Sequence, residues 1–447
     1  MEWDKLLSSK RFSKEKEEIK EYIPSNREDN PSRTDYHQDH DRVVFSRSFR
    51  RLGRKTQVHP LATNDHTHNR LTHSVEVGAV GRSIGIKVGQ KLKELNHLPE
   101  NILPTDIGSI VQVACLAHDI GNPPFGHAGE EALREWFTNE NNKKYLLEIS
   151  QDELLDLQTY EGNAHALRIV CTTEMYKHRG GMRLSCATLG SLLKYPWISS
   201  EAEKSGKFNI YQSELDYFKI VAKELGLKEI IEGKKWARHP LSFIMEAADD
   251  ICYSVLDTED AVEMGIVSID DFSKIFHEFL PDKKMNDLDT AQKCAFTRSK
   301  FIGSCIDFVT EEFLKNYNEI MTGTFTEKDF FKSSNHPTAE TLKLSKNFAA
   351  KNIYTHPNKV KREIGAYPCL HHLLDLFIPT VNNLYEKNGD ISSIDGRDRT
   401  ILKLLDRIPS VKNGKYFAYM EIMDFLGGMT DNYAINLATE TSGFSRN

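Results

Sequence analysis

The chain has 447 residues, of which 39% are hydrophobic and 28% charged, an ordinary composition for a globular protein. Its formal net charge of −7 argues against a dedicated nucleic-acid binder, because such a protein carries a strongly basic surface. No run of about 18 apolar residues is present to span a bilayer, and the first residues lack the basic start and apolar centre of a signal peptide. We therefore expect a cytoplasmic protein without a membrane segment.

The seven cysteines are scattered along the chain, and no two of them form a CxxC pair. Most lie within apolar helical patterns, as Cys115 and Cys252 do. This distribution predicts reduced, buried thiols rather than a disulfide framework or a zinc knuckle.

Residues 1–35 are polar and charged and contain two prolines, so we expect a loose N-terminal arm with at most one short helix. From Asp39 the pattern becomes helical and strongly basic. A basic helix of this kind is either a solvated surface or a contact for phosphate or nucleic acid, and the sequence leaves both interpretations open. Its arginines are Arg42, Arg47, Arg50, Arg51 and Arg54.

The next predicted helix lies around residues 71–84, where Leu71, Val75 and Ile84 recur at helical spacing. Its glycines form a stripe that would let another helix approach closely. His73 lies inside this helix. A histidine in such a position is either a satisfied core residue or a ligand, and the residue alone does not decide between them.

A further helix is predicted to begin with Thr105 as its cap and to end at His118, and its apolar character on most faces places it in the centre of the fold. His118 and Asp119 then supply a nitrogen and an oxygen that together suit a divalent metal ion. The alternative is a polar helix end. Gly121 and the two prolines after it are the stop signal of this helix.

Beyond the turn, His127 and Glu130 lie three residues apart at the start of a new helix. They therefore share a face, and the carboxylate can orient the imidazole for proton transfer. The spacing of Gly121 and Gly126 imitates a P-loop, but His127 stands where a lysine is required and a helix precedes the segment instead of a strand. We therefore reject a P-loop.

A later helix, within residues 239–257, carries Asp249, Tyr253 and Asp257 at intervals of four residues, so the three side chains share one face. Two carboxylates on one stripe of a buried helix need a partner, which a metal ion or ligand hydroxyls would provide. The alternative is a solvated acidic face.

Four of these side chains form a candidate metal site with two nitrogens and two carboxylates: His73, His118, Asp119 and Asp249. Such a mixed set leaves positions open for water and substrate oxygens, as catalytic metal sites do. The order His, His-Asp, Asp along a helical chain resembles the HD-domain metal-dependent phosphohydrolases.

Further blocks make the resemblance more specific, and from about residue 33 to residue 434 the chain is similar to the bacterial deoxyguanosine triphosphate triphosphohydrolase (dGTPase) family. The blocks are RRLGRKTQV (50–58), NRLTHSVEV (69–77), HDIGNPPFGHAGE (118–130), EGN (161–163), RGG (179–181), YP (195–196), EAADDICY (246–253) and MTDNYA (429–434).

The resemblance implies a role for each candidate residue. One divalent metal ion, Mg²⁺ or Mn²⁺ or alternatively another transition metal, would be held by the four ligands named above. His127 and Glu130 would form the catalytic pair. The residues expected to hold the deoxyribose are Gln57, Tyr253 and Asp257, and those expected beside the triphosphate are Arg70 and Asn122.

No convincing alternating strand pattern is present, so we predict an all-α, mainly helical chain. With the resemblance, this becomes an HD-domain helical core over residues 36–270 after the N-terminal arm. Residues 139–158 and 198–238 would be peripheral insertions in that core. A C-terminal helical region, residues 271–447, would complete the pocket.

The implied reaction is the hydrolysis of dGTP to deoxyguanosine and inorganic triphosphate, by water attack at the α-phosphorus. A broad-specificity dNTP triphosphohydrolase or another HD-type nucleotidase is the alternative. A more distant alternative is a non-catalytic protein that binds nucleotides or single-stranded DNA. The resemblance also implies a homo-oligomer, often a hexamer, and leaves room for regulation by single-stranded DNA.

Overall fold

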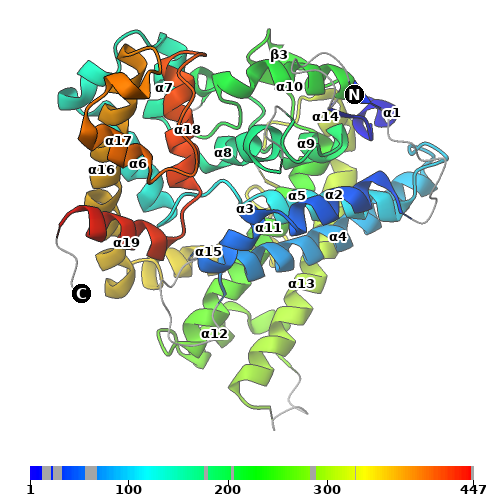
Figure 1. Cartoon of the computed structure of the whole chain (residues 1–447). Helices are drawn as coiled ribbons and strands as arrows, with labels where there is room; N and C mark the ends of the chain where they lie inside the picture. Colours follow the sequence, from blue (N-terminus) through cyan, green and yellow to red (C-terminus); the bar gives the residue numbers. More distant parts are fainter. Residues whose placement is uncertain are drawn as a thin grey trace.

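The computed structural model describes residues 1–12, 22–23, 33–55, 68–175, 180–202, 206–281, 288–327 and 329–443. Helices make up nearly all of the regular structure in these ranges, which confirms the mainly helical prediction (Figure 1). The strands are short and form two antiparallel pairs: β1 (Arg11–Phe12) with β2 (Tyr22–Ile23), and β3 (Glu229–Ile231) with β4 (Lys235–Trp236).

The helices of the first half are α1 (Trp3–Leu6), α2 (Asp35–Val44), α3 (Arg47–Arg51), α4 (Arg70–Glu94), α5 (Pro104–Ala117), α6 (His127–Thr138), α7 (Gln151–Gln158), α8 (Gly162–Arg168), α9 (Cys186–Leu192) and α10 (Gln212–Leu225). Those of the second half are α11 (Pro240–Glu263), α12 (Ile269–Ile275), α13 (Thr290–Lys315), α14 (Tyr317–Thr322), α15 (Pro337–Asn352), α16 (Pro357–Glu386), α17 (Gly396–Leu402), α18 (Lys415–Gly427) and α19 (Asp431–Thr441).

The centre of the fold is the pair α4 and α5, with α11 packed against both. The glycine stripe of α4 faces α5: a side chain added at Gly85 would lie 2.9 Å from the Cα atom of Gly108. The two backbones therefore approach more closely than ordinary side chains allow. Because α5 is buried on nearly all sides, the prediction that it is central is confirmed.

The start of α5 differs from the prediction. Thr105 does not cap the helix, because Pro104 already occupies the first helical position. Proline fits there, since it lacks only an N–H group that would have no helical partner. The backbone N–H of Leu103 instead donates to Asp106 Oδ2 at 2.9 Å.

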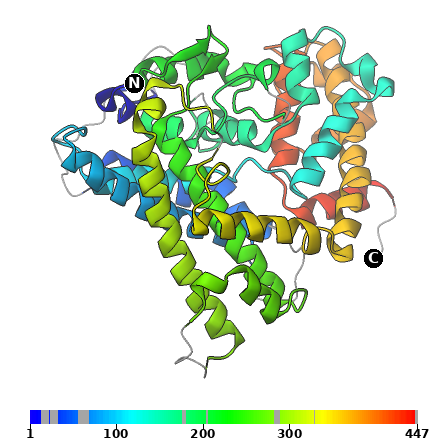
Figure 2. The same cartoon turned by 180° about the vertical axis from the view of Figure 1, so that it is seen from behind.

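Two buried cores organise the molecule, and both contain residues from either side of the expected boundary at residue 270. The first joins α4, α5 and α11 to α13 and to residues as late as Leu342. The second joins α6 and α7 to α16–α19, which form a lobe at one side of the molecule (Figures 1 and 2). The C-terminal helices therefore share their cores with helices that precede residue 270.

Residues 1–12 are packed against the body, in contrast to the loose arm that we expected. Trp3 and Leu6 are buried, and the Trp3 indole N–H donates to the Tyr317 hydroxyl at 2.9 Å. The Tyr36 hydroxyl donates to the Leu7 carbonyl at 2.6 Å. The few large apolar side chains of this polar stretch are enough to anchor it.

The two segments expected to be peripheral insertions also contribute to the interior. Phe218 and Trp236, within residues 198–238, are fully buried with their rings edge to face. Asp156, within residues 139–158, is buried and accepts a hydrogen bond of 2.7 Å from the Tyr416 hydroxyl of α18. Charged residues on their outer faces gave these segments a peripheral appearance.

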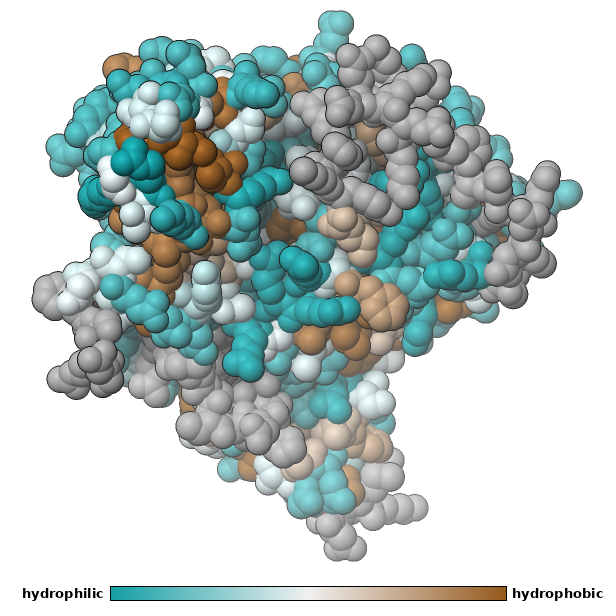
Figure 3. Space-filling view, viewed as in Figure 1, coloured by the Kyte–Doolittle hydropathy of each residue, from teal (hydrophilic) through white to brown (hydrophobic). Residues whose placement is uncertain are grey.

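All seven cysteines are free and six are buried, which agrees with the prediction of reduced thiols. None of the helices in the described ranges combines the length and the apolar character that a bilayer span requires. The face shown in Figure 3 is largely hydrophilic, with a hydrophobic area over the lobe of α16–α18.

Candidate active site

The first part of the candidate site is the N-terminal turn of α4. Asn69 caps this helix by accepting hydrogen bonds from the backbone N–H groups of Leu71 and Thr72. Arg70 and His73 follow at helical spacing, and both side chains are buried. The cap therefore fixes the helix end that carries a cation and a potential metal ligand on one face.

The second part is the turn that follows α5. His118 Nδ1 lies 2.5 Å from the carbonyl oxygen of Cys115, so Nδ1 carries the proton and donates it. A side chain at Gly121 would lie 2.1 Å from the Gly162 carbonyl oxygen, which explains why this position has none. Close contact with α8 thus shapes the turn that presents His118 and Asp119.

Asp249 of α11 supplies the third part. Its Oδ1 atom lies 3.2 Å from His73 Nε2 and 3.3 Å from His118 Nε2. Its Oδ2 atom accepts a hydrogen bond of 2.6 Å from the Lys194 ammonium group. Burial alone would raise the pKa of Asp249, but Lys194 and then His118 lower it well below its usual range, so the carboxylate is ionised.

The chemistry of these three residues fits a divalent metal ion. Ligand atoms of His73, His118 and Asp249 all lie within 4.8 Å of one another. Because His118 donates through Nδ1, the lone pair of its Nε2 atom faces the Asp249 carboxylate. Two lone pairs at that distance repel each other unless a cation or a proton lies between them, and a metal ion supplies that positive charge.

Asp119 lies beside this cluster but outside the group of converging ligand atoms. Its Oδ1 atom is 3.6 Å from His118 Nε2, and its Oδ2 atom accepts a hydrogen bond of 2.8 Å from Arg70. Burial would raise the pKa of Asp119, but Arg70 and then His118 lower it to about 2. Three of the four predicted ligands therefore converge, and the fourth is an ionised neighbour.

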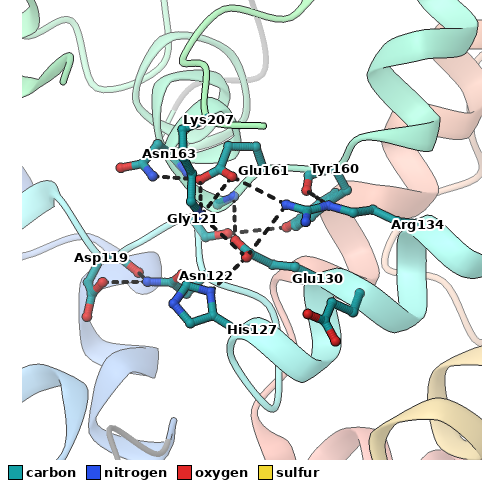
Figure 4. A network of polar contacts seen from close by, with 12 residues as sticks. Asp119, Gly121, Asn122, His127, Glu130, Arg134, Tyr160, Glu161, Asn163 and Lys207 are labelled. Carbon is teal, nitrogen blue, oxygen red and sulfur yellow. Dashed lines mark hydrogen bonds and ion pairs between the residues drawn. The ribbon is translucent and has the colours of Figure 1, made fainter. Parts of the chain in front are cut away.

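Figure 4 shows Asn122 between Asp119 and the pair formed by His127 and Glu130. His127 Nδ1 is 2.9 Å from Glu130 Oε2, and the imidazole is 79% exposed while the carboxylate is buried. Burial would raise the pKa of Glu130, but the hydrogen bond with His127 and then the charge of Lys207 lower it to about 2. An ionised carboxylate thus orients an imidazole whose other nitrogen faces outward.

Two residues connect the pair to the cluster. The amide nitrogen of Asn122 donates to Asp119 Oδ1 at 2.5 Å. A side chain at Gly126, which has a φ of 58°, would lie 2.8 Å from Arg70 Nη2. Glycine is therefore suited to this position for two reasons: its backbone has a positive φ, and a Cβ atom would collide with the guanidinium. Arg70 and Asn122, the predicted triphosphate neighbours, therefore lie between the two parts of the site.

Of the three residues predicted to hold the sugar, the structure describes Tyr253 and Asp257. Gln57 lies outside the described residues. The ring of Tyr253 lies 5.7 Å from that of Tyr354, whose hydroxyl donates to Asp257 Oδ2 at 2.5 Å. Burial raises the pKa of Asp257 to about 7, against the opposing effect of the Tyr354 hydrogen bond.

Three residues of the candidate site were not predicted from the sequence. Lys194 lies next to Tyr195-Pro196, one of the blocks of the resemblance, so the block was a usable signal. Lys55 donates to the carbonyl oxygens of Asn122 and Gly427 at 2.6 Å each, and burial, with Arg51 and Arg70 nearby, lowers its pKa to about 7. Tyr354 had no signal, because its partners are about a hundred residues away in the chain.

Comparison with known proteins agrees with this geometry. Residues 70–232 match the HD domain family. A deoxyguanosinetriphosphate triphosphohydrolase-like protein of Pseudomonas aeruginosa is 40% identical, with 100% of this chain and 99% of the relative covered. One from Synechocystis is 34% identical, with both chains covered completely. A deoxyguanosinetriphosphate triphosphohydrolase of Klebsiella pneumoniae is 31% identical over 89% of this chain and 92% of the relative. The chain therefore belongs to the deoxyguanosinetriphosphate triphosphohydrolase-like family of HD-domain proteins.

Proposed function

We propose that this protein hydrolyses dGTP to deoxyguanosine and inorganic triphosphate, by attack of water at the α-phosphorus. The observation that carries this proposal is the convergence of His73, His118 and Asp249 beside the His127 and Glu130 pair. A metal-ligand set next to a proton-transfer pair is the equipment that phosphoester hydrolysis needs. The names of the relatives support dGTP as the substrate.

The metal would be held by His73, His118 and Asp249, with Asp119 as the fourth ligand. We propose Mg²⁺ or Mn²⁺, one ion per site, because the family resemblance implies these ions and both take carboxylate and water oxygens as ligands. When bound, such an ion polarises a phosphoryl oxygen and lowers the pKa of a water molecule.

The triphosphate would lie against Arg70 and Asn122. Arg70 keeps its positive charge at every accessible pH, and only its Nη1 atom is used by Asp119. The Nη2 atom lies toward Gly126, immediately before His127. This places a cation where the charge of a phosphate chain would need to be neutralised.

His127 would move the proton of the reaction. Its Nδ1–H group donates to the ionised Glu130, so its Nε2 atom is the one that can exchange a proton with the leaving 5′-oxygen or hold the attacking water. The carboxylate keeps the imidazole in this orientation.

The deoxyribose would lie between Tyr253 and Asp257, with Gln57 as the third contact. Tyr354 occupies one oxygen of Asp257, which leaves the other for the 3′-hydroxyl. A ring and a carboxylate on one helix face are suited to a sugar, which offers an apolar face and hydroxyl groups.

The test is product analysis with metal-free protein, each of the four dNTPs and either Mg²⁺ or Mn²⁺, in water enriched in ¹⁸O. Attack at the α-phosphorus predicts deoxyguanosine without label and triphosphate with one ¹⁸O atom. Release of dGDP and phosphate would overturn the proposed bond cleavage. Equal turnover of all four dNTPs would indicate the broad-specificity enzyme, and no product with either ion would indicate a nucleotide-binding protein.

We further propose a cytoplasmic homo-oligomer, often a hexamer in this family, with single-stranded DNA as a regulatory ligand. Light scattering would measure the oligomer. DNA binding through arginines would weaken steeply as salt concentration rises, and binding that does not respond to salt would argue against it.

A further inference from the structure

A second buried carboxylate lies behind Glu130. Glu161, at the N-terminus of α8, is fully buried, and Figure 4 shows it facing the same two cations as Glu130. These cations are Arg134 of α6 and Lys207, which precedes α10. Two carboxylates and two cations therefore form one charge-balanced group beneath His127.

The distances show which carboxylate the cations prefer. Arg134 Nη2 lies 3.3 Å from Glu161 Oε2 but 3.8 Å from Glu130 Oε2. Lys207 Nζ lies 2.9 Å from Glu161 Oε2 but also 3.8 Å from Glu130 Oε2. Both cations thus hydrogen-bond to Glu161 and remain just out of hydrogen-bond range of Glu130.

The Glu130 atom that the cations face is the one that His127 uses. Glu130 Oε2 accepts from His127 Nδ1, whereas Glu130 Oε1 accepts from the backbone N–H of Gly162 at 2.8 Å. A shift of less than 1 Å would let either cation bond to Oε2 and compete with the imidazole. Burial and the charge of Glu130 raise the pKa of Glu161, as expected for two carboxylates that share the same cations.

We propose that Glu161 is a positioning residue for the His127 and Glu130 pair. Its charge holds Arg134 and Lys207 off Glu130 Oε2, so that this oxygen stays available to the imidazole. The inference deepens the proposed function and rests on it for the catalytic role of His127, but the hydrogen bond itself does not depend on the substrate.

The test uses Glu161→Gln, because glutamine keeps an oxygen that can accept from the backbone N–H of Asn163, at the start of α8, and removes the negative charge. The variant should lower kcat roughly tenfold, part of the 10²–10⁴-fold that a positioned acid or base contributes, without changing KM or metal content. In a His127→Ala background, Glu161→Gln should have no further effect. An equal loss in both backgrounds would overturn the inference.

A rescue variant gives a second readout. Adding Lys207→Met to Glu161→Gln removes one of the two competing cations and should restore part of the lost kcat. Lys219→Met is the matched control, because Lys219 lies on the surface of α10, where its ammonium group is 3.5 Å from Asp216 Oδ1. A double variant no better than Glu161→Gln alone, or rescued equally by Lys219→Met, would contradict the mechanism.

A third readout needs no substrate. In ¹⁵N-histidine-labelled protein, the hydrogen-bonded Nδ1–H resonance of His127, assigned by its absence in His127→Ala, should be lost in Glu161→Gln. If Glu161→Gln does not fold, Lys207→Met, at a side chain that is 26% exposed, should retain the resonance. Retention in the first variant or loss in the second overturns the inference. If wild-type protein cleaves no dNTP, the proposed function fails, while this resonance still decides the role of Glu161.

Discussion

Replacing Gly162 by alanine should separate activity from stability. A Cβ atom at this position would lie 2.7 Å from Asn122 Oδ1 and 2.8 Å from Glu130 Oε1, whereas ordinary contacts begin near 3.4 Å. Both side chains would have to retreat by about 0.6–0.7 Å, the difference between these distances. They are flexible side-chain ends, so we expect a loss of only about 1 kcal/mol in the free energy of unfolding, at the low end for overpacking.

The effect on activity should be much larger. A misplacement of about 1 Å in an active site reduces the rate by roughly 10²-fold, and Glu130 and Asn122 both contact the candidate catalytic groups. We therefore expect kcat for triphosphate release to fall by between about 10-fold and 10²-fold, by the same relation.

The assay combines steady-state kinetics with denaturant unfolding of the same samples. Gly303→Ala is the control: nothing lies within 4 Å of a Cβ atom at that position in α13, so it should gain about 0.5–1 kcal/mol in stability and keep its kcat. A folded Gly162→Ala protein with wild-type kcat would refute the reasoning, because Glu130 would then tolerate displacement.

Three further predictions concern single side chains. His127→Ala should lose roughly 10²–10⁴ in kcat with metal content unchanged by elemental analysis, and full activity would remove His127 from the reaction. Burial raises the pKa of Asp156 from 3.8 to about 7, so the folded state holds a proton that the unfolded state releases, and stability falls as pH rises between these values. Between pH 5 and 8 this fall amounts to about 3 kcal/mol; Asp156→Asn should abolish it in urea unfolding over that range, and an unchanged pH slope would exclude Asp156 as its source. Arg168 donates to both oxygens of Asp424 and to Glu214, so Arg168→Met should lower stability by about 3–5 kcal/mol, and a Tm close to that of wild type would mean that the two carboxylates find other partners.

Features within single helices could be predicted from the sequence. The spacing of Asp249, Tyr253 and Asp257 placed them on one helix, and α11 carries all three. The doublet His118 and Asp119 was correctly placed at a helix end. These features depend on the helical period and on capping, which involve residues at most a few positions apart.

Contacts between distant segments could not be read in this way. Lys194 bonds to Asp249 across 55 positions, and Glu130 bonds to the backbone of Gly162 across 32. Likewise, Phe218 and the C-terminal helices belong to the buried cores, although the polar residues around Phe218 in the sequence suggested a peripheral position.

The sequence by itself determined the helices, the ligand types and, through the resemblance, the chemistry of the site. Only the tertiary structure decided that Asp119 pairs with Arg70 while the three other candidate ligands converge, and that Glu161 shares its cations with Glu130. The physical reason is that helix formation is governed by neighbours in the chain, whereas the partner of a buried charge is set by which helices bury their apolar faces together.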